Sequence, residues 1–155
     1  LHDALPIFDK AIQLDPDYAK AYYSRGNAYV SLGQYQRAIQ DYDKAIQLDP
    51  DDADAYNNRG YSYDELGQYE RAIQDYDKAI QLDPDNALAY LNRGVSYRKL
   101  GQYQRAIQDY DKAIQLDPDY ANAYFNRGVS YASLGQTANA DADFAKACEL
   151  DRSLC

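Results

Sequence analysis

The sequence is poor in the residues that build metal sites and disulfide frameworks. Its 155 residues include one His, two Cys, no Trp and no Met. One His and two Cys cannot supply a multi-ligand zinc site or a disulfide framework. Cations are also scarce, because 16 Lys and Arg stand against 25 Asp and Glu, for a net charge of −9. This negative charge repels phosphates and no basic stripe offsets it, so we expect no nucleic-acid partner.

Long apolar runs and processing signals are absent as well. The sequence has no stretch of about 18 apolar residues, so no segment is predicted to span a membrane. It also lacks a positively charged start followed by an apolar stretch, which is the pattern of a signal peptide. We therefore expect a cytoplasmic protein with no membrane partner.

The sequence patterns of catalysis and cofactor binding are missing. The only histidine is His2, so a Ser–His or Cys–His pair is not expected in the repeated part of the chain. The eight Gly are isolated, and the Asp-Pro-Asp turns lack the Gly and final Glu of a calcium loop. We predict no catalytic residue, no metal and no cofactor.

The two cysteines, Cys148 and Cys155, are seven residues apart. In a continuous helix they would lie about 10 Å apart along the axis, which is too far for a disulfide. We therefore expect no bond between them, and only intermolecular oxidation of Cys155.

What the sequence does contain is an internal repeat. The string RAIQDYDKAIQLDP occurs at 37–50, 71–84 and 105–118, with an offset of 34 residues each time. A fainter copy lies at 8–16, and a degraded copy lies at 140–151. A period of 34 residues predicts a helix–turn–helix unit.

Each repeat has the pattern of two amphipathic helices. In the first half, apolar and aromatic residues such as Tyr22 and Tyr29 recur at spacings of three and four, which places them on one helix face. Gly33 can end this helix in a left-handed conformation, and Pro50 stops the second helix. Gly26 lies within the first helix, where Gly costs up to about 1 kcal/mol relative to Ala. Because it recurs in all four copies, we predict that only a hydrogen atom fits where the two helices cross.

The pattern Tyr56…Gly60…Tyr63…Gly67-x-Tyr69…Ala72…Tyr76…Ala79…Pro84 resembles the tetratricopeptide repeat, and the likeness covers nearly the whole chain. The resemblance implies an all-α fold, a right-handed α-solenoid of antiparallel helix pairs with about nine helices. The expected divisions are a truncated repeat at 1–18 with a second helix only, repeats at 19–52, 53–86 and 87–120, and a degenerate C-terminal capping repeat at 121–155. The resemblance also implies a non-catalytic scaffold, whose concave groove, lined by the first helices, holds a partner peptide or helix.

Differences between the copies indicate where a partner binds. The three clean copies all disagree at six positions, and five of these fall within an arc of roughly 100° on the first helix. The opposite arc carries the recurring Tyr, Arg, Gly and Leu. The alternative is drift on a solvated face, but exposed second-helix residues such as Gln40 and Asp43 recur unchanged. Recent duplication would explain why the exposed second-helix residues are uniform. It does not explain why the differences are confined to the first helix, so we favour a recognition surface there.

The predicted groove residues occupy the variable positions of the first helices and the neighbouring asparagine position. They are Lys20, Tyr23, Asn27, Val30, Asp54, Asn57, Asn58, Tyr61, Asp64, Glu65, Leu88, Leu91, Asn92, Val95, Arg98, Lys99, Asn122, Phe125, Asn126 and Val129. The set is mixed polar in the first copy, acidic in the second, and apolar with adjacent cations in the third and fourth. An exposed apolar patch typically marks a partner site. A matching ligand would bring apolar side chains to the third and fourth copies and a basic group toward the second.

The recurring asparagines Asn58, Asn92 and Asn126 can be interpreted in two ways. Their amides can grip a peptide backbone, or they can bridge neighbouring helices. Chaperone-binding members of the family hold a C-terminal carboxylate with Lys, Asn and Arg side chains. The matching positions here are Tyr23, Asn27, Asn58, Leu88 and Asn92, or, one copy along, Asn57, Tyr61, Asn92, Asn122 and Asn126. Neither set contains a cation to pair with a carboxylate, so we disfavour that binding mode.

An arginine in each first helix and an aspartate in each second helix also recur. The residues are Arg25, Arg59, Arg93 and Arg127, with Asp41, Asp75, Asp109 and Asp143. The degraded copy keeps both partners although it has lost much else. We predict an Arg–Asp pair within each repeat, with a structural role.

Both ends of the chain depart from the repeat. In the last second helix, Thr137, Asp141 and Cys148 replace Tyr, Ile and Ile, which predicts the wetter outer face of a capping repeat and a natural end to the chain. The codons for residues 1–7 can spell the end of a common sequencing adapter, so we set this segment aside as foreign and expect further repeats upstream. The orphan helix around Phe8 leaves an apolar side bare, which would favour dimerisation.

The sequence therefore favours a non-catalytic scaffold that binds a protein or peptide. Two alternatives stay open. One is structural self-assembly, as a homo-oligomer through the N-terminal orphan helix or by end-to-end stacking of repeats. The other is a consensus-like engineered repeat scaffold, which the near-identical second helices would suit.

Overall fold

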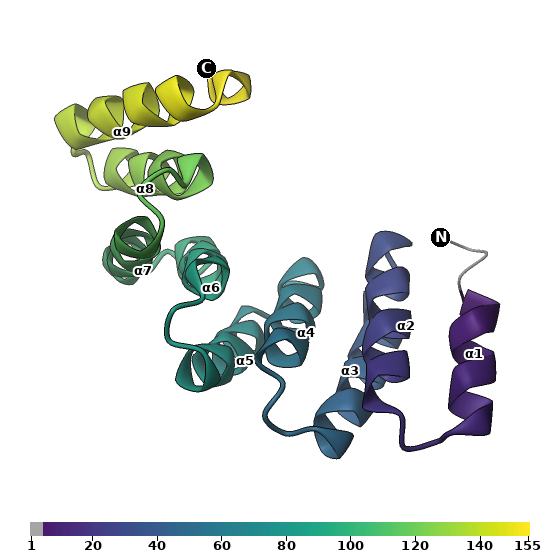
Figure 1. The fold of residues 1–155 in the computed structure, drawn as a ribbon. Coiled ribbons are helices and arrows are strands. Elements are labelled where there is room, and N and C mark those ends of the chain that lie inside the picture. The colour runs from purple at the N-terminus through teal and green to yellow at the C-terminus, as the bar shows by residue number, and fades with distance from the viewer. Residues whose placement is uncertain (1–4) are drawn as a thin grey trace. The chain divides into compact units, whose positions relative to one another are not determined.

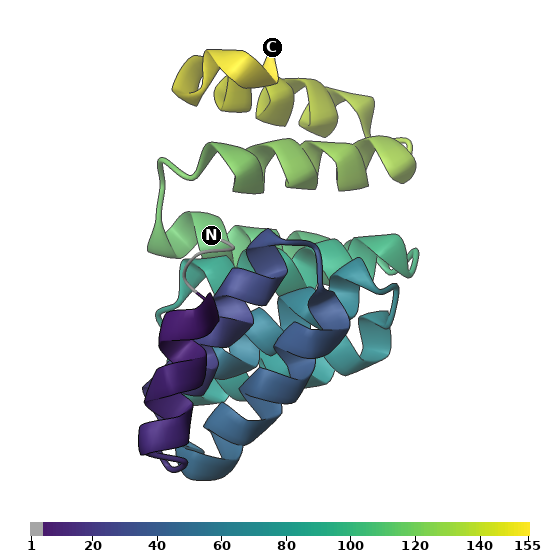
Figure 2. The same cartoon turned by 90° about the vertical axis from the view of Figure 1, so that its right-hand side faces the viewer.

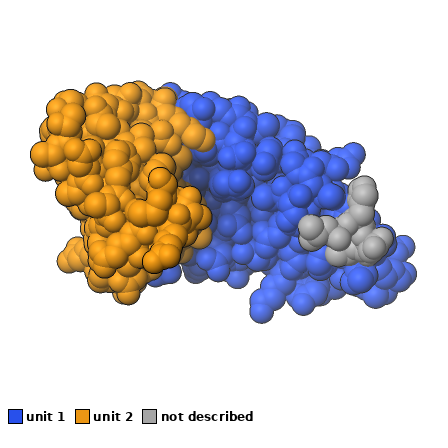
Figure 3. Space-filling view, turned by 90° about the horizontal axis from the view of Figure 1, so that it is seen from above, with its two compact units in different colours: residues 1–83 blue, residues 84–155 orange. Residues whose placement is uncertain are grey.

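The computed structural model describes residues 5–155, which form nine α-helices and no β-strand. These residues divide into two compact units, 1–83 and 84–155, which Figure 3 shows in different colours. The segment 1–7 set aside above is described only from Leu5 onward, and His2 lies outside the described residues.

The described part of the first unit, residues 5–83, contains five helices. They are α1 (Leu5–Leu14), α2 (Ala19–Ser31), α3 (Tyr35–Leu48), α4 (Ala53–Glu65) and α5 (Tyr69–Leu82). The pairs α2–α3 and α4–α5 pack side by side and run antiparallel, and α3 also packs against α4 (Figures 1 and 2). Helix α1 packs against α2 and begins one residue before Pro6, whose missing N–H is tolerated in the first turn of a helix.

The second unit, 84–155, repeats this arrangement. Its elements are α6 (Ala87–Lys99), α7 (Tyr103–Leu116), α8 (Ala121–Ser133), α9 (Thr137–Leu150) and a short 3₁₀ helix, η2 (Arg152–Leu154). Helix α6 pairs with α7 and α8 pairs with α9, while α7 packs against α8 (Figure 1).

Local sequence signals set the helix ends. Gly33 follows α2 with φ of 69°, a left-handed conformation that a residue with a Cβ rarely adopts. The second helix α3 ends at Leu48, because Asp49 is extended and Pro50 has no N–H to continue the helix. Asp52 then caps α4 by accepting a hydrogen bond from the Ala55 N–H at 3.0 Å.

The crossing of the two helices in each pair is very close. A Cβ on Gly60 of α4 would lie 2.8 Å from Cε1 of Tyr76, which is itself almost fully buried on α5. In the second unit, a Cβ on Gly94 would lie 2.6 Å from Cε1 of Tyr110. The prediction that only a hydrogen atom fits at these positions is confirmed, because the tyrosine ring fills the space that a side chain would need.

The last repeat differs from the others as its sequence indicates. Asp141 of α9 is exposed, whereas Ile39 at the equivalent position of α3 is only 3% exposed. Phe144 replaces the buried tyrosine and lies against Gly128 in the same way.

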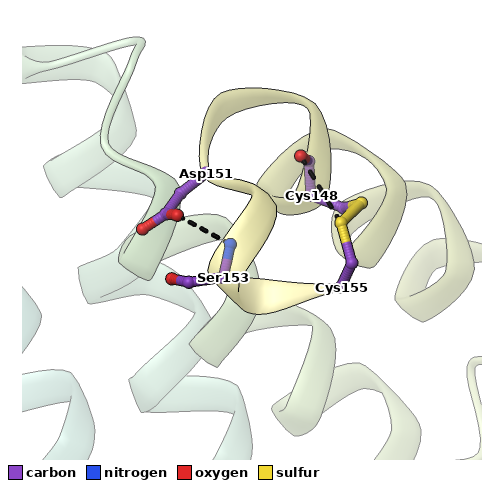
Figure 4. Close-up of a disulfide and its surroundings, with 4 residues drawn as sticks. All are labelled: Cys148, Asp151, Ser153 and Cys155. Atoms are coloured by element: carbon purple, nitrogen blue, oxygen red, sulfur yellow. Dashed lines mark hydrogen bonds between the residues drawn. A yellow bond between two sulfur atoms is a disulfide. The ribbon is translucent and has the colours of Figure 1, made fainter.

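The expectation that Cys148 and Cys155 stay unbonded is wrong, because the structure has a disulfide between them (Figure 4). Helix α9 ends at Leu150 and Asp151 is extended, so the continuous helix assumed for the distance does not exist. The turn of η2, in which Asp151 accepts the Ser153 N–H at 2.9 Å, brings the two Cα atoms to 4.9 Å. This separation is within the range of natural disulfides.

We predict that Gly60→Ala destabilises the chain although Ala is the better helix former. The added methyl group would overlap the Tyr76 ring and the Ala72 carbonyl oxygen, 3.2 Å away, so the free energy of unfolding should fall by about 1–3 kcal/mol. Urea denaturation followed by circular dichroism measures this. Gln74→Ala, at an exposed position of α5, is the control and should change the free energy by less than about 0.5 kcal/mol. Equal stability of the two variants would show that the helix crossing has room to spare.

Candidate functional site

The invariant side of the first helix α4 is held by an arginine that contacts two second helices. In the first unit, Arg59 of α4 donates from Nε to Oδ2 of Asp75 at 2.8 Å and from Nη2 to Oδ1 at 2.7 Å. Its remaining nitrogen, Nη1, donates to Oδ1 of Asp43 on α3 at 2.7 Å. One guanidinium therefore joins its own repeat to the preceding one.

The same contacts recur in both units. Arg25 pairs with Asp41 and with Asp9 of α1, and Arg127 pairs with Asp143 and with Asp111 of α7. Arg93 pairs with Asp109, with Nη2 2.6 Å from Oδ1. The structure thus brings together all four residue pairs that the sequence places in single repeats.

The aspartate of each pair is buried, while the arginine keeps some exposure. Asp75 is 6% exposed, and burial raises the pKa of its carboxyl above the ordinary value, while the hydrogen bonds from Arg59 act in the opposite direction. The hydrogen bond to Asp143 raises the pKa of Arg127 above its ordinary value. The Asp75 carboxylate therefore relies on Arg59 as its charge partner in a nearly dry site.

The sequence analysis missed the second aspartate that contacts Arg25, Arg59 and Arg127. Asp43 recurs unchanged on a second helix, and we treated it as part of a solvated face. The signal was present, because Asp9, Asp43 and Asp111 each precede their arginine by 16 residues, the same separation by which the predicted partner follows it. The recurrence of Asp43 therefore has a structural reason and no longer argues for a recognition surface.

Aromatic rings complete this framework. The guanidinium of Arg59 lies 5.5 Å from the ring centroid of Tyr56, and that of Arg71 lies 5.7 Å from the ring of Tyr63. Such contacts are worth about 0.5–1 kcal/mol at partly exposed sites. The recurring tyrosines on these faces thus serve the packing of the repeats.

The predicted groove residues of the first unit differ widely in exposure. Four are exposed, six are not. The exposed residues are Lys20, Asp54, Tyr61 and Glu65; the half-buried ones are Tyr23, Asn27, Val30 and Asn58; and the buried ones are Asn57 and Asp64. The surface open to a partner on α2 and α4 is therefore narrower than the sequence indicates.

Asn58 is engaged within the first unit. Its Nδ2 donates to Oδ1 of Asn27 at 3.0 Å and to the hydroxyl of Tyr23 at 3.1 Å, both on α2. Its Oδ1 accepts from Nδ2 of Asn57 at 3.3 Å, and Asn27 also accepts from the Tyr42 hydroxyl at 2.6 Å. Of the two interpretations of this position, the bridging of neighbouring helices describes the contacts at Asn58.

In the second unit, the apolar residues predicted for the groove floor belong partly to the core. Leu91 is 7% exposed and packs with Ala106, Tyr110, Ala113 and Ala123, and Val95 packs against the same cluster. The Phe125 and Phe144 rings lie 5.6 Å apart between centroids. Leu88 is 46% exposed.

The remaining predicted residues of the second unit are polar apart from Val129. Lys99 and Asn122 are exposed, and Asn92, Arg98, Asn126 and Val129 are half-buried. Nδ2 of Asn126 donates to the Asn122 carbonyl oxygen at 2.8 Å within α8. The open surface of this unit is therefore formed mainly by Leu88, Lys99 and Asn122, with half-buried neighbours.

Groups of metal ligands and membrane-spanning helices are both absent from the described residues. No group of three or more His, Cys, Asp and Glu side chains in residues 5–155 is arranged to hold a metal ion. Among the described helices, none is both long and apolar enough to cross a membrane.

Sequence profiles of the tetratricopeptide repeat match most of the chain. One profile, described as TPR repeat, matches residues 26–67 and 94–135. Others, described as tetratricopeptide repeat, match 53–86, 121–154, and 7–40 with 75–108. The chain belongs to the tetratricopeptide repeat family. No curated protein sequence matches it.

Solved structures with the same fold include repeat proteins of this family. MamA 41-end from Desulfovibrio magneticus RS-1 is 27% identical, with a TM-score of 0.90, over 98% of this chain and 86% of that one. YrrB, described as a TPR protein with an unusual peptide-binding site, is 28% identical, with a TM-score of 0.82, over 99% and 80%. The first TPR of Spaghetti (RPAP3), bound to the HSP90 peptide SRMEEVD, is 27% identical, with a TM-score of 0.74, over 76% and 93%.

These similarities and the helices of residues 5–155 confirm the all-α fold of tetratricopeptide repeats that the sequence predicts. Tetratricopeptide repeat proteins are typically non-catalytic modules of protein interaction, and two of the similar structures are described by the peptides or peptide sites that they contain.

We predict that Asp75→Asn lowers the free energy of unfolding by about 2–3 kcal/mol. The substitution removes the buried negative charge and leaves the Arg59 guanidinium without its bidentate partner. Asp43→Asn is the matched control, because Asp43 binds the same guanidinium but its side chain is 53% exposed, so its loss should cost under about 1 kcal/mol. Thermal and urea melts of both variants measure this. Unchanged stability of Asp75→Asn would remove the structural role of the pair.

Proposed function

We propose that the chain is a non-catalytic protein-interaction module whose variable first-helix faces bind an extended segment or a helix of a partner protein. One observation carries this proposal. The exposed residues of the first helices differ from copy to copy, whereas the exposed second-helix residues Gln40, Gln74 and Gln108 are the same. A face that is exposed and also chemically distinct in each copy can select a partner, which a uniform face cannot.

The two units offer different chemistry to a partner. In the first unit, the exposed residues of α4 are Asp54, Tyr61 and Glu65, so this face is acidic and aromatic. In the second unit, Leu88 and Lys99 present an apolar and a basic group. We propose that the partner places basic side chains on the first unit and apolar side chains on the second.

This chemistry differs from what a carboxylate-terminated peptide would need. The first TPR of Spaghetti (RPAP3) is bound to the HSP90 peptide SRMEEVD, in which three of the last four residues are acidic. On the first unit here, acidic groups occupy the exposed positions of α4, and like charges repel. We therefore propose a partner other than an acidic C-terminal peptide.

We propose that the chain is not an enzyme, and its family and fold support this. The chemistry of its variable faces also suits recognition. We also propose a cytoplasmic location, which the sequence favours. The disulfide between Cys148 and Cys155 weighs against it, because such bonds are typical of oxidising compartments.

We predict that a change on a variable face weakens peptide binding, while the same charge on the uniform face does not. Peptides selected from a random displayed library on the full chain provide the probe. Leu88→Glu places a charge on an exposed apolar position of α6. It should weaken the binding of those selected peptides that are apolar by about tenfold. Gln108→Glu, on the exposed face of α7, should leave the dissociation constant within about twofold. Loss of binding in Gln108→Glu alone would place the site on the second helices.

Self-assembly is a second candidate function, supported by the exposure of α1. Leu14, which lies outside the segment set aside above, is 73% exposed, and α1 has no buried residue. An unpartnered apolar helix face of this kind favours association with another copy.

For this candidate, we expect the mass measured by light scattering to rise with concentration toward that of two chains. The variant Leu14→Ser should keep the mass of one chain, because the apolar side chain that drives association is gone. A mass of one chain at all concentrations for the unmodified protein would exclude self-assembly through α1.

A further inference from the structure

Three side chains from two helices of the first unit meet at one end of α4. Tyr35, the first residue of α3, donates from its hydroxyl to Oε2 of Glu65 at 3.2 Å. The rings of Tyr35 and Tyr61 meet edge to face, with centroids 6.3 Å apart and an interplanar angle of 76°. We call these residues the Tyr35–Tyr61–Glu65 cluster.

The cluster has the components of a site for a cationic side chain. The Glu65 carboxylate is exposed, and its one hydrogen-bond partner among the described residues is the Tyr35 hydroxyl, so Oε1 remains open to a donor. Tyr61 is 37% exposed, and its edge contact with Tyr35 sets the orientation of its ring. A guanidinium or ammonium group binds both to a carboxylate and to the face of an aromatic ring.

The Tyr35 hydroxyl positions the carboxylate. Burial and the neighbouring Glu65 charge raise the pKa of Tyr35 above its ordinary value, so the phenol stays protonated and keeps donating. A carboxylate already held by one hydrogen bond loses less conformational freedom when a cation binds to it.

The framework of the repeat does not require this chemistry. In the second unit, the residues equivalent to Tyr35, Tyr61 and Glu65 are Tyr103, Val129 and Ser133. Here the structure keeps the same helices with a valine and a serine at the two α8 positions. Tyr61 and Glu65 are therefore particular to one copy.

The carboxylate of Asp54 extends the site along α4. Asp54, Tyr61 and Glu65 are spaced by seven and four residues, so they share one helix face, and Asp54 is exposed. The distance from Asp54 to Glu65 along the helix is about 16 Å at 1.5 Å per residue. An extended peptide covers this distance in about five residues.

We propose that the Tyr35–Tyr61–Glu65 cluster binds a Lys or Arg side chain of a basic peptide segment, and that Asp54 binds a second basic side chain about five residues away. This inference rests on the proposed function, because it names the partner chemistry for the first unit. The net charge of −9 also attracts a basic segment at long range.

The test uses the full chain and a fluorescent Gly/Ser peptide that carries two arginines five residues apart. The comparison peptide has citrulline in place of both arginines, which keeps the shape and removes the charge. Fluorescence anisotropy at low ionic strength, about 50 mM salt, gives the dissociation constants. We expect the arginine peptide to bind at least about tenfold more tightly than the citrulline peptide.

Variants of the chain locate the site. Glu65→Ser and Tyr61→Val introduce the residues of the fourth copy, so both should fold with unchanged circular dichroism. Each should weaken the arginine peptide by about three- to tenfold. Asp17→Ser removes the same charge from an exposed turn before α2 and should have less than about a twofold effect. Equal binding by the unmodified chain and Glu65→Ser, or equal binding of the two peptides, would overturn the inference.

A selection from a random peptide library separates failure of this inference from failure of the proposed function. Enriched basic peptides that lose binding in Glu65→Ser support the inference. Enriched peptides without basic residues, which bind the unmodified chain and Glu65→Ser alike, overturn the inference and leave the proposed function intact. A library that yields no binder at all overturns both.

Discussion

The arginine of each first helix is the interaction on which the rest of the structure depends. Its planar guanidinium has donors in a fixed fork, so one side chain can hold a buried aspartate on two bonds and still reach a second aspartate. Arg59 does this for Asp75 of its own repeat and Asp43 of the preceding one. The helix pair and the connection between successive repeats within a unit are thereby fixed by the same residue. A lysine, with a single point charge, could not reproduce this geometry.

Fixing one side of the first helix leaves its other side open to change. Gly60 must stay small because Tyr76 fills the crossing, and Arg59 must face the second helices. The repeat fold does not require a particular residue on the opposite side. Tyr61 and Glu65 lie there, and the last repeat has Val129 and Ser133 at the same positions. Variation between the copies is thus concentrated on this side of the first helices, and the Tyr35–Tyr61–Glu65 cluster includes two of its residues.

Sequence alone predicted the fold and the Arg–Asp partners because both rest on recurrence. A residue repeated every 34 positions reports a constraint common to all copies, as Gly60 and Asp75 do. Variable positions report only that no common constraint exists. Variability at the position of Leu91 did not predict that this residue belongs to the core cluster of the second unit. Its burial depends on the packing of α6 against its neighbours. The cysteine pair escaped prediction for a related reason, since its geometry depends on where α9 ends.

A double-mutant cycle on Arg59 and Asp75 tests the central role of the arginine most directly. The free energies of unfolding of the unmodified chain, Arg59→Gln, Asp75→Asn and the double variant would be measured by urea denaturation. The account predicts a coupling energy of about 1–3 kcal/mol between the two positions, because each residue satisfies the charge of the other in a buried site. Additive effects, with a coupling energy below about 0.5 kcal/mol, would contradict it.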